Sequence, residues 1–160
     1  MTIQRFMLTM SAGAMLAFGA SAALAAGNPA MGTWEMNVAK STVDAKNAAR
    51  SETFVFANSD KGVILTTNIT AAAGKQTTHT SDPSPWDGAA HAVSDSAEHD
   101  SIMAKSVGAG IVRYSFMKAG AVINSGTLAV SKDGTMLTIA GARTSAKGGK
   151  GYYNIVFDRK

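Results

Sequence analysis

Residues 32–41, with the sequence GTWEMNVAKS, decide the expected fold. Trp34, Met36 and Val38 alternate with polar residues, and this period of two is typical of a strand with one buried face. Gly32, just before this alternation, permits a sharp bend of the backbone at the start of the strand. The stretch therefore predicts a strand that enters the domain abruptly and buries a large aromatic ring near its first residue.

A tryptophan at that position fits a particular role in an antiparallel barrel. There the first strand pairs with the last strand, and a large flat side chain at its start seals one end. Arg159 or Lys160, at the end of the last strand, would then lie over the Trp34 ring. A core position in any β domain gives the same spacing, so the pattern leaves both interpretations of Trp34 open.

The same alternation recurs along the rest of the chain, interrupted by turns rich in Gly, Asn and Asp. It predicts about ten strands at intervals of roughly eight to twelve residues, which indicates an antiparallel barrel or sandwich. The one helical candidate is residues 42–50, where Asp44 is available as an N-terminal cap. The expected strands occupy residues 32–38, 51–58, 63–70, 76–81, 89–93, 100–107, 110–118, 121–131, 135–143 and 152–160.

Two further stretches accompany GTWEMNVAKS, namely VSKDGTMLT at residues 130–138 and PWDG at residues 85–88. The opening stretch resembles those of lipocalins and of intracellular fatty-acid-binding proteins, two barrel families of the calycin group. All three stretches together resemble a group of small exported bacterial proteins, mostly uncharacterised, that begin G-T-W-K-L-N-x-A-K-S. The resemblance implies an all-β fold, a single antiparallel up-and-down β-barrel of the calycin or lipocalin type with 8–10 strands.

The resemblance does not extend to the carboxylate-binding residues of the fatty-acid-binding proteins. Those proteins hold the ligand carboxylate with an Arg and a Tyr two residues apart in the last strand. The matching residues here are Ile155 and Phe157, and neither carries a polar group. The resemblance therefore leaves an apolar or neutral ligand as the expectation.

Residues 1–25 have the pattern of a signal peptide. Arg5 precedes an uncharged run rich in Ala, Leu, Met and Phe, and Ala23 and Ala25 supply the A-x-A spacing that signal peptidase accepts. We expect cleavage after Ala25 or Ala26, which leaves one domain of residues 26–160, periplasmic or secreted, without a transmembrane span. A retained membrane anchor is the alternative, because the run is long enough to cross a bilayer at ~20 residues.

Composition narrows the class further. The chain has no cysteine, which excludes disulfides, thiol redox chemistry and cysteine-based zinc sites. The formal net charge is +4, and we assign the charged residues to solvated turns and faces, although the basic second half could favour an anionic ligand or a membrane surface. Nucleic acid is not an expected partner of an exported protein, and no cofactor is expected. The sequence contains no G-x-S-x-G, no H-E-x-x-H and no phosphate loop.

Strand parity selects the residues that would line a hollow barrel. Arg113 is ambiguous: it faces solvent if Val112 and Tyr114 face the core, but inside a hollow barrel it could hold an anion. Burying an unpaired guanidinium is costly, which favours the outward orientation. The candidate ligand-binding residues are Trp34, Met36, Phe54, Phe56, Leu65, Arg113, Tyr114, Phe116 and Phe157.

The histidines raise the question of a metal site. His91, His99 and Asp100 fall within residues 91–100, and imidazole with carboxylate suits several divalent metals, but the spacing fits no established ligand motif. We therefore expect neither a metal nor a catalytic residue.

Two functions remain. The first is an exported, non-enzymatic barrel that binds a small hydrophobic molecule. The alternative is an envelope structural or protein-interaction module with a filled barrel, which would contact a partner through the loop around Trp86 or the basic tail. An interior below ~300 Å³ would count against the first.

Overall fold

The computed structural model describes residues 27–42, 49–71, 73–94, 96–144 and 148–160. The expected signal peptide lies outside these residues, as does most of the helical candidate at 42–50. Thr42 forms an isolated antiparallel bridge with Asn154, and the next described residues, Ala49 and Arg50, already belong to a strand.

The described residues form a sheet of ten strands and one short 3-10 turn, η1, at Val38–Lys40. Period-two alternation of apolar and polar side chains produces these strands, because it gives the sheet one buried face. The strands are β1 (Gly32–Met36), β2 (Ala49–Ser59), β3 (Gly62–Ala71), β4 (Gln76–Thr80), β5 (Asp87–Ala92), β6 (Ser101–Gly108), β7 (Ile111–Lys118), β8 (Ala121–Val130), β9 (Met136–Thr144) and β10 (Lys150–Arg159).

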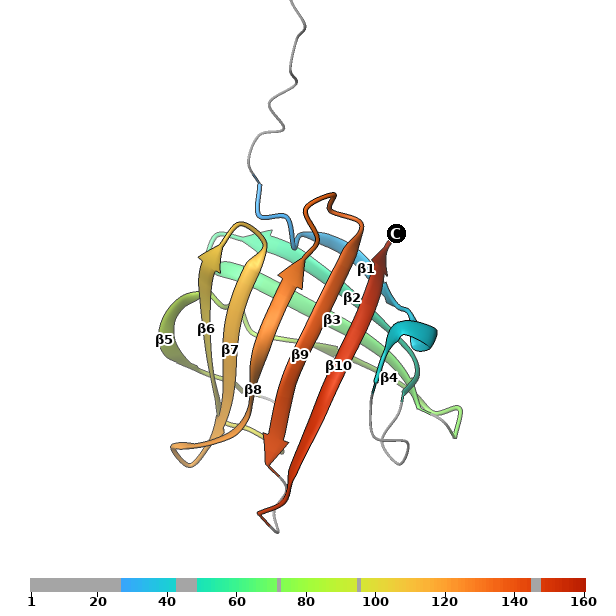
Figure 1. Ribbon diagram of the computed structural model, residues 1–160. Helices are drawn as coiled ribbons and strands as arrows, with labels where there is room; N and C mark the ends of the chain where they lie inside the picture. The colour runs from blue at the N-terminus through green and yellow to red at the C-terminus, as the bar shows by residue number, and fades with distance from the viewer. Residues whose placement is uncertain (1–26, 43–48, 72, 95, 145–147) are drawn as a thin grey trace, which may run out of the picture.

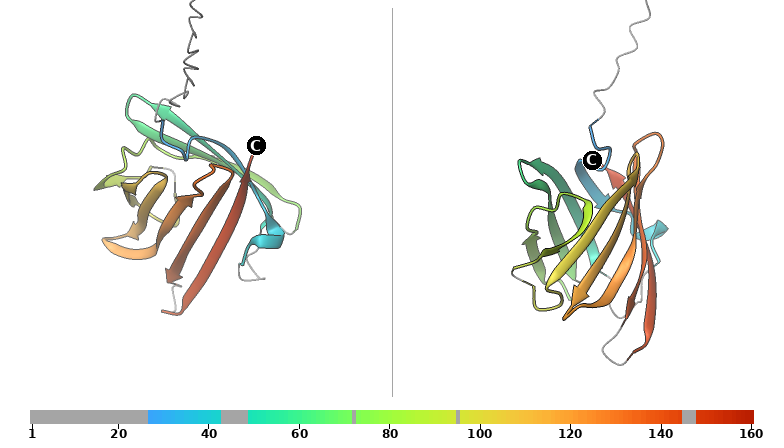
Figure 2. Two further views of the ribbon diagram at one scale, coloured as in Figure 1. Left: turned by 45° about the horizontal axis from the view of Figure 1, so that its top comes forward. Right: turned by 90° about the vertical axis from the view of Figure 1, so that its left-hand side faces the viewer.

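All neighbouring strands are antiparallel, in the order β4-β3-β2-β1-β10-β9-β8-β7-β6-β5. The first strand pairs with the last, as the barrel interpretation requires, with Trp34 opposite Arg159 and Met36 opposite Phe157. Figures 1 and 2 show the sheet curled so that β2, β3 and β4 cross behind β6–β10. The interior lies between these two halves.

The barrel is not closed by hydrogen bonds, which corrects the expectation of a closed ring. β4 and β5 are the two edges of the sheet, and no ladder joins them within the described residues. The connecting segment contains Pro83 and Pro85, which have no N–H to donate to a ladder. Ser84, between them, instead exchanges two backbone hydrogen bonds with Val63 of β3, at 2.8 and 2.9 Å.

The first strand is shorter than its sequence pattern predicts. β1 ends at Met36, and the side chain of Asn37 accepts a hydrogen bond from the Lys40 N–H, which caps the turn η1. Val38 therefore leaves the inward-facing row and is 57% exposed. The alternation predicted the parity of Trp34 and Met36 correctly but placed Val38 wrongly, because local capping ends the strand.

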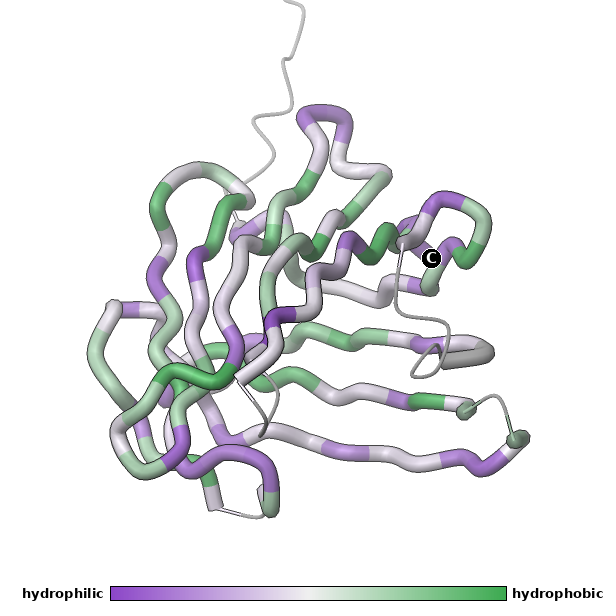
Figure 3. The backbone as a smooth tube through the Cα atoms, turned by 60° about the horizontal axis from the view of Figure 1, so that its bottom comes forward, coloured by the Kyte–Doolittle hydropathy of each residue, from purple (hydrophilic) through white to green (hydrophobic). Residues whose placement is uncertain are grey.

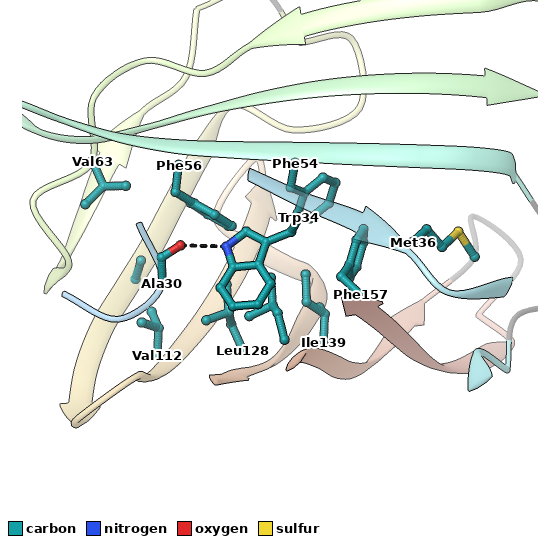
Figure 4. Close-up of a cluster of buried hydrophobic side chains, with 12 residues drawn as sticks. Ala30, Trp34, Met36, Phe54, Phe56, Val63, Val112, Leu128, Ile139 and Phe157 are labelled. Carbon is teal, nitrogen blue, oxygen red and sulfur yellow. Dashed lines mark hydrogen bonds between the residues drawn. The ribbon is translucent and has the colours of Figure 1, made fainter. Parts of the chain in front are cut away.

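Trp34 seals one end of the barrel, here called the closed end. The residue is fully buried, and its indole N–H donates to the Ala30 carbonyl at 2.8 Å (Figure 4). Phe157 and Leu137 are also fully buried in this cluster. A plug of this kind removes apolar surface from water at ~25 cal/mol per Å².

Arg159 covers the plug from outside. Its guanidinium carbon lies 4.1 Å from the centre of the Trp34 ring, which confirms the prediction for this residue. The same group donates to the carbonyls of Pro29, Met31 and Gly134 at 2.6, 2.9 and 2.6 Å. It thereby ties the segment before β1 to the turn between β8 and β9.

Gly32 is required beneath this arginine. Its φ is +119°, a region that other residues rarely adopt, and a Cβ there would lie 2.9 Å from Arg159 Nη1. The sharp bend expected at the start of the first strand is therefore present.

Candidate ligand-binding cavity

A cavity of about 820 Å³ occupies the interior beyond the plug. Figure 3 turns the end of β9 and the start of β10 toward the viewer and shows the two groups of strands that face each other across it. This end is here called the open end. The apolar part of the wall consists of Met36, Phe54, Phe56, Val63, Leu65, Ile69, Pro83, Trp86, Ala92, Val93, Ile102, Ala104, Val112, Phe116, Leu128, Ile139 and Ile155.

The aromatic rings are packed to form the wall nearest the plug. Phe54 lies 4.6 Å from Phe157 and 6.0 Å from Phe56, measured between ring centres. Trp86, from the segment between β4 and β5, contacts Phe56 edge-on at 6.1 Å. The cavity is therefore deepest where its wall is most apolar.

A row of hydrogen-bonded hydroxyls crosses the middle of the wall. The Tyr114 and Tyr153 hydroxyls lie 2.6 Å apart, and the Tyr153 hydroxyl donates to Asn124 Oδ1 at 2.6 Å. Tyr153 therefore accepts from Tyr114. Burial is the main cause that raises the pKa of Tyr114, so its hydroxyl stays protonated at physiological pH.

Two glycines make this row possible. Tyr114 of β7 is opposite Gly126 of β8, Gly126 is opposite Gly141 of β9, and Gly141 is opposite Tyr153 of β10. A Cβ on Gly126 would come within 2.6 Å of the Tyr114 hydroxyl, and one on Gly141 within 2.5 Å of the Tyr153 hydroxyl. The two phenol rings thus lie flat over bare backbone and meet between the two glycines.

Glu52 places a carboxyl group on the same interior surface. It has the inward parity of Phe54 and Phe56 on β2, is opposite Ile69 on β3, and lines the cavity. No hydrogen bond or ion pair joins it to any other residue that the structure describes. Burial raises the pKa of Glu52 from 4.5 to about 7.

Ser84 adds a hydroxyl near the deep part of the cavity. The residue is only 6% exposed and lines the wall, and its backbone is paired with Val63. Its Oγ is the one buried side-chain oxygen or nitrogen among the described residues that lacks a hydrogen-bond partner. Buried hydroxyls are normally paired, so this atom is an unusual unpaired group enclosed in the wall.

All three histidines of the chain line the cavity. His79 is on β4 and His91 on β5, so they stand on the two unpaired edges. His99 packs on Phe116 with ring centres 4.6 Å apart, and burial is the main cause that lowers its pKa. His91 Nε2 lies 2.9 Å from Asp87 Oδ1. Across the described residues, no three His, Cys, Asp or Glu side chains are grouped to hold a metal ion.

The cationic side chains among the described lining residues lie at the rim of the open end. Arg143 and Lys150 line the cavity there, and both are exposed. Arg143 is paired with Glu98 at 3.4 Å, and both side chains of that pair are largely in solvent. No Lys or Arg from the described residues lies deeper among the lining residues.

The structure brings most of the predicted ligand-binding residues together. Trp34 and Phe157 form the plug beneath the cavity and are not part of its lining. Arg113 is exposed on the outer face, which corrects its place among the candidate binding residues and agrees with its parity. An outward guanidinium avoids the cost of burying an unpaired charge. The predicted residues that do line the cavity are Met36, Phe54, Phe56, Leu65, Tyr114 and Phe116.

Several residues that shape the cavity or its wall were missed at the sequence level. Glu52 had a clear signal, since it precedes Phe54 and Phe56 with the same parity, but acidic residues in strands usually face solvent. Gly126 and Gly141 are recognisable only once the register of four strands is known. The position of Ser84 depends on how its proline-containing segment folds against β3, which no local pattern encodes.

No family model and no curated protein matches the chain. Among solved structures, the chain is similar to zebrafish ileal bile acid-binding protein in its crystal structure with cholic acid. The two share 10% sequence identity with a TM-score of 0.53, and the match covers 82% of this chain and 99% of that one. The likeness confirms a calycin-like fold, as the resemblance of residues 32–41 implied.

Proposed function

We propose that this chain is an exported, non-enzymatic barrel protein that binds a small hydrophobic molecule. The observation that supports this most directly is the cavity of about 820 Å³ with a largely apolar wall. Cavities that hold small molecules measure roughly 300–1,000 Å³ and combine an apolar lining with a few polar groups. A filled interior, which the alternative function requires, is at odds with that volume.

The two ends of the barrel suit this role differently. The plug of Trp34 and Phe157 closes one end, whereas the opposite end and the unpaired edges of β4 and β5 leave a route to solvent. Burying the tail of a ligand against the apolar wall contributes ~25 cal/mol per Å². The zebrafish neighbour, crystallised with cholic acid, offers a parallel for ligand uptake in a sheet of this shape.

Export is the cellular part of the proposal and is supported by the leader sequence of residues 1–25. The chain has no cysteine, so it can fold in an oxidising compartment without mispaired disulfides. Among the described residues, no helix has the length and apolarity needed to cross a bilayer.

Binding of an uncharged fluorescent dye, N-phenyl-1-naphthylamine, tests the proposal. Dye fluorescence should rise on binding to the mature protein. Leu65→Trp, which adds bulk inside the cavity, should abolish the rise while circular dichroism shows a folded protein. Val122→Trp is the matched control, because Val122 is 52% exposed on β8. Equal dye binding by Leu65→Trp and Val122→Trp would overturn the proposal.

A second measurement identifies what the barrel carries. Native mass spectrometry of protein isolated from its own periplasm should show a retained mass of small-molecule size. A clean unliganded mass, together with failure to bind the dye, would refute a carrier function.

A further inference from the structure

The polar groups inside the cavity indicate the chemical class of the ligand. Glu52 is the feature that needs an explanation, since it presents a carboxyl group to an apolar interior and has no partner among the described residues. Glu52 is partly buried, and a carboxylate withdrawn from water is stabilised when a positive charge or hydrogen-bond donors compensate that loss. The described residues of the unliganded protein supply neither.

The described cationic residues nearest the cavity do not pair with the carboxyl group of Glu52. Arg143 and Lys150 are exposed at the rim, where water screens them, and Arg143 is paired with Glu98. Burial raises the pKa of Glu52, and no positive charge among the described residues lowers it. Within the described part of the chain, the carboxyl group therefore faces the cavity without a counter-ion.

The three histidines also have other neighbours. His91 lies against Asp87 at 2.9 Å, and His99 contacts Ser96 Oγ at 3.0 Å and the ring of Phe116 at 4.6 Å. His79 is on the edge strand β4 and lies near enough to His99 and Asp82 to influence the pKa of each. None of the three influences the pKa of Glu52.

Of the remaining polar groups on the wall, Asp82 is a carboxylate that already accepts hydrogen bonds from the Ser94 N–H and Oγ at 2.8 and 2.9 Å, and the others are neutral. The Tyr114–Tyr153–Asn124 row is internally hydrogen bonded, and the unpaired Ser84 Oγ is enclosed in the wall. An anionic ligand head buried in this cavity would find no Lys or Arg below the rim, so far as the described residues extend, and would lie in the same interior as a carboxyl group. A cationic head would find a carboxylate in need of a partner.

We propose, on the premise that the barrel binds a small hydrophobic molecule, that its ligand is an apolar amine whose ammonium group pairs with the Glu52 carboxylate. The apolar body of the amine occupies the space between Phe54, Leu65 and Ile139. Both charges lose water on binding, and each regains a charge-assisted hydrogen bond, which is the strong class of such bonds. The aromatic rings around the cavity add favourable contacts to a cation.

Three probes with one chain length test this assignment: decylamine, 1-decanol and decanoate, each displacing N-phenyl-1-naphthylamine at pH 7.5. Decylamine should bind about tenfold more tightly than 1-decanol, and decanoate should bind least. Glu52→Gln should reduce the affinity for decylamine to that for 1-decanol and leave 1-decanol itself unchanged. Glu35→Gln is the matched control, since Glu35 is an exposed carboxylate on β1.

The outcomes separate the two proposals. Tightest binding of decanoate, or equal decylamine affinities for the native chain and Glu52→Gln, would overturn the amine assignment and leave a hydrophobic carrier standing. Failure of the dye and all three probes to bind would overturn the proposed function itself. A decylamine preference that Glu52→Gln removes and Glu35→Gln retains supports both.

Discussion

The two ends of the barrel differ in whether their polar groups have hydrogen-bond partners. At the closed end, the indole N–H of Trp34 has a carbonyl partner and the guanidinium of Arg159 has three. Toward the open end, the carboxyl group of Glu52 lacks a partner among the described residues, as does the buried Ser84 Oγ deeper in the cavity wall. Paired groups stabilise a fold, whereas unpaired buried groups cost free energy and persist where a ligand supplies the missing partner. The closed end therefore stabilises the fold, whereas the cavity leaves Glu52 without a partner among the described residues, as the proposed binding function requires.

Replacing the plug tests the closed end most severely. Trp34→Ala should lower the free energy of unfolding by about 3–5 kcal/mol, since it leaves a void beneath Arg159 and removes the ring under the guanidinium. Urea denaturation followed by circular dichroism measures the loss. Trp34→Phe, which keeps an aromatic ring, is the control and should lose less. A loss below about 1 kcal/mol for Trp34→Ala would mean that this end does not hold the barrel together.

Glu52→Gln should instead raise the free energy of unfolding of the unliganded protein at alkaline pH. Because the folded pKa of Glu52 is about 7 against an ordinary 4.5, the folded state binds the carboxyl proton more tightly than the unfolded state. That contribution to stability is complete below pH 4.5, is lost as pH rises through 7, and amounts to roughly 3 kcal/mol. The unliganded variant should therefore be more stable than the native chain at pH 8.

The pH dependence of the unfolding midpoint separates an effect of carboxylate ionisation from a change in stability that is independent of pH. At pH 4 the carboxyl group is protonated in both folded and unfolded chains, so Glu52→Gln and the native chain should have similar unfolding midpoints. Glu35→Gln, on the outer face, should not produce the gain at pH 8. If Glu52→Gln destabilises the unliganded protein at pH 8, the carboxylate has a partner and the contrast between the two ends fails.

The closed end could be predicted from sequence to a greater extent than the cavity. Trp34 and Arg159 lie at the ends of the first and last strands, and pairing of those strands brings them together without further information. The cavity depends on the register of several strands, as for Gly126 and Gly141, and on a proline-containing segment that pairs with β3 and leaves β4 and β5 apart. Period-two alternation predicts which face is inside but not whether that face is filled.

Gly126→Ala tests the row of tyrosines in the cavity wall. Its Cβ would collide with the Tyr114 hydroxyl and with the Ala140 carbonyl, so stability should fall by about 1–3 kcal/mol. Thermal unfolding of the variant measures this loss. Gly148→Ala is the control, because a Cβ there meets nothing within 4 Å, although its φ of +79° adds a local backbone cost. A smaller loss for Gly126→Ala than for Gly148→Ala would show that the close packing over the glycine is unimportant.

Of the substitutions considered, Tyr153→Phe should change the stability of the fold least. Loss of its hydroxyl leaves Tyr114 without an acceptor and Asn124 Oδ1 without a donor, which costs about 1 kcal/mol. Tyr152→Phe is the matched control one residue away, since Tyr152 is 75% exposed and should tolerate the change. Differential scanning calorimetry of the two variants compares their stabilities directly.

Because the row of Tyr114, Tyr153 and Asn124 faces the cavity, a ligand that reaches it can supply the missing hydrogen bond. Bound 1-decanol should therefore narrow the difference in stability between Tyr153→Phe and the native chain. An unchanged difference with saturating 1-decanol would show that the row orders the wall and does not contact the ligand.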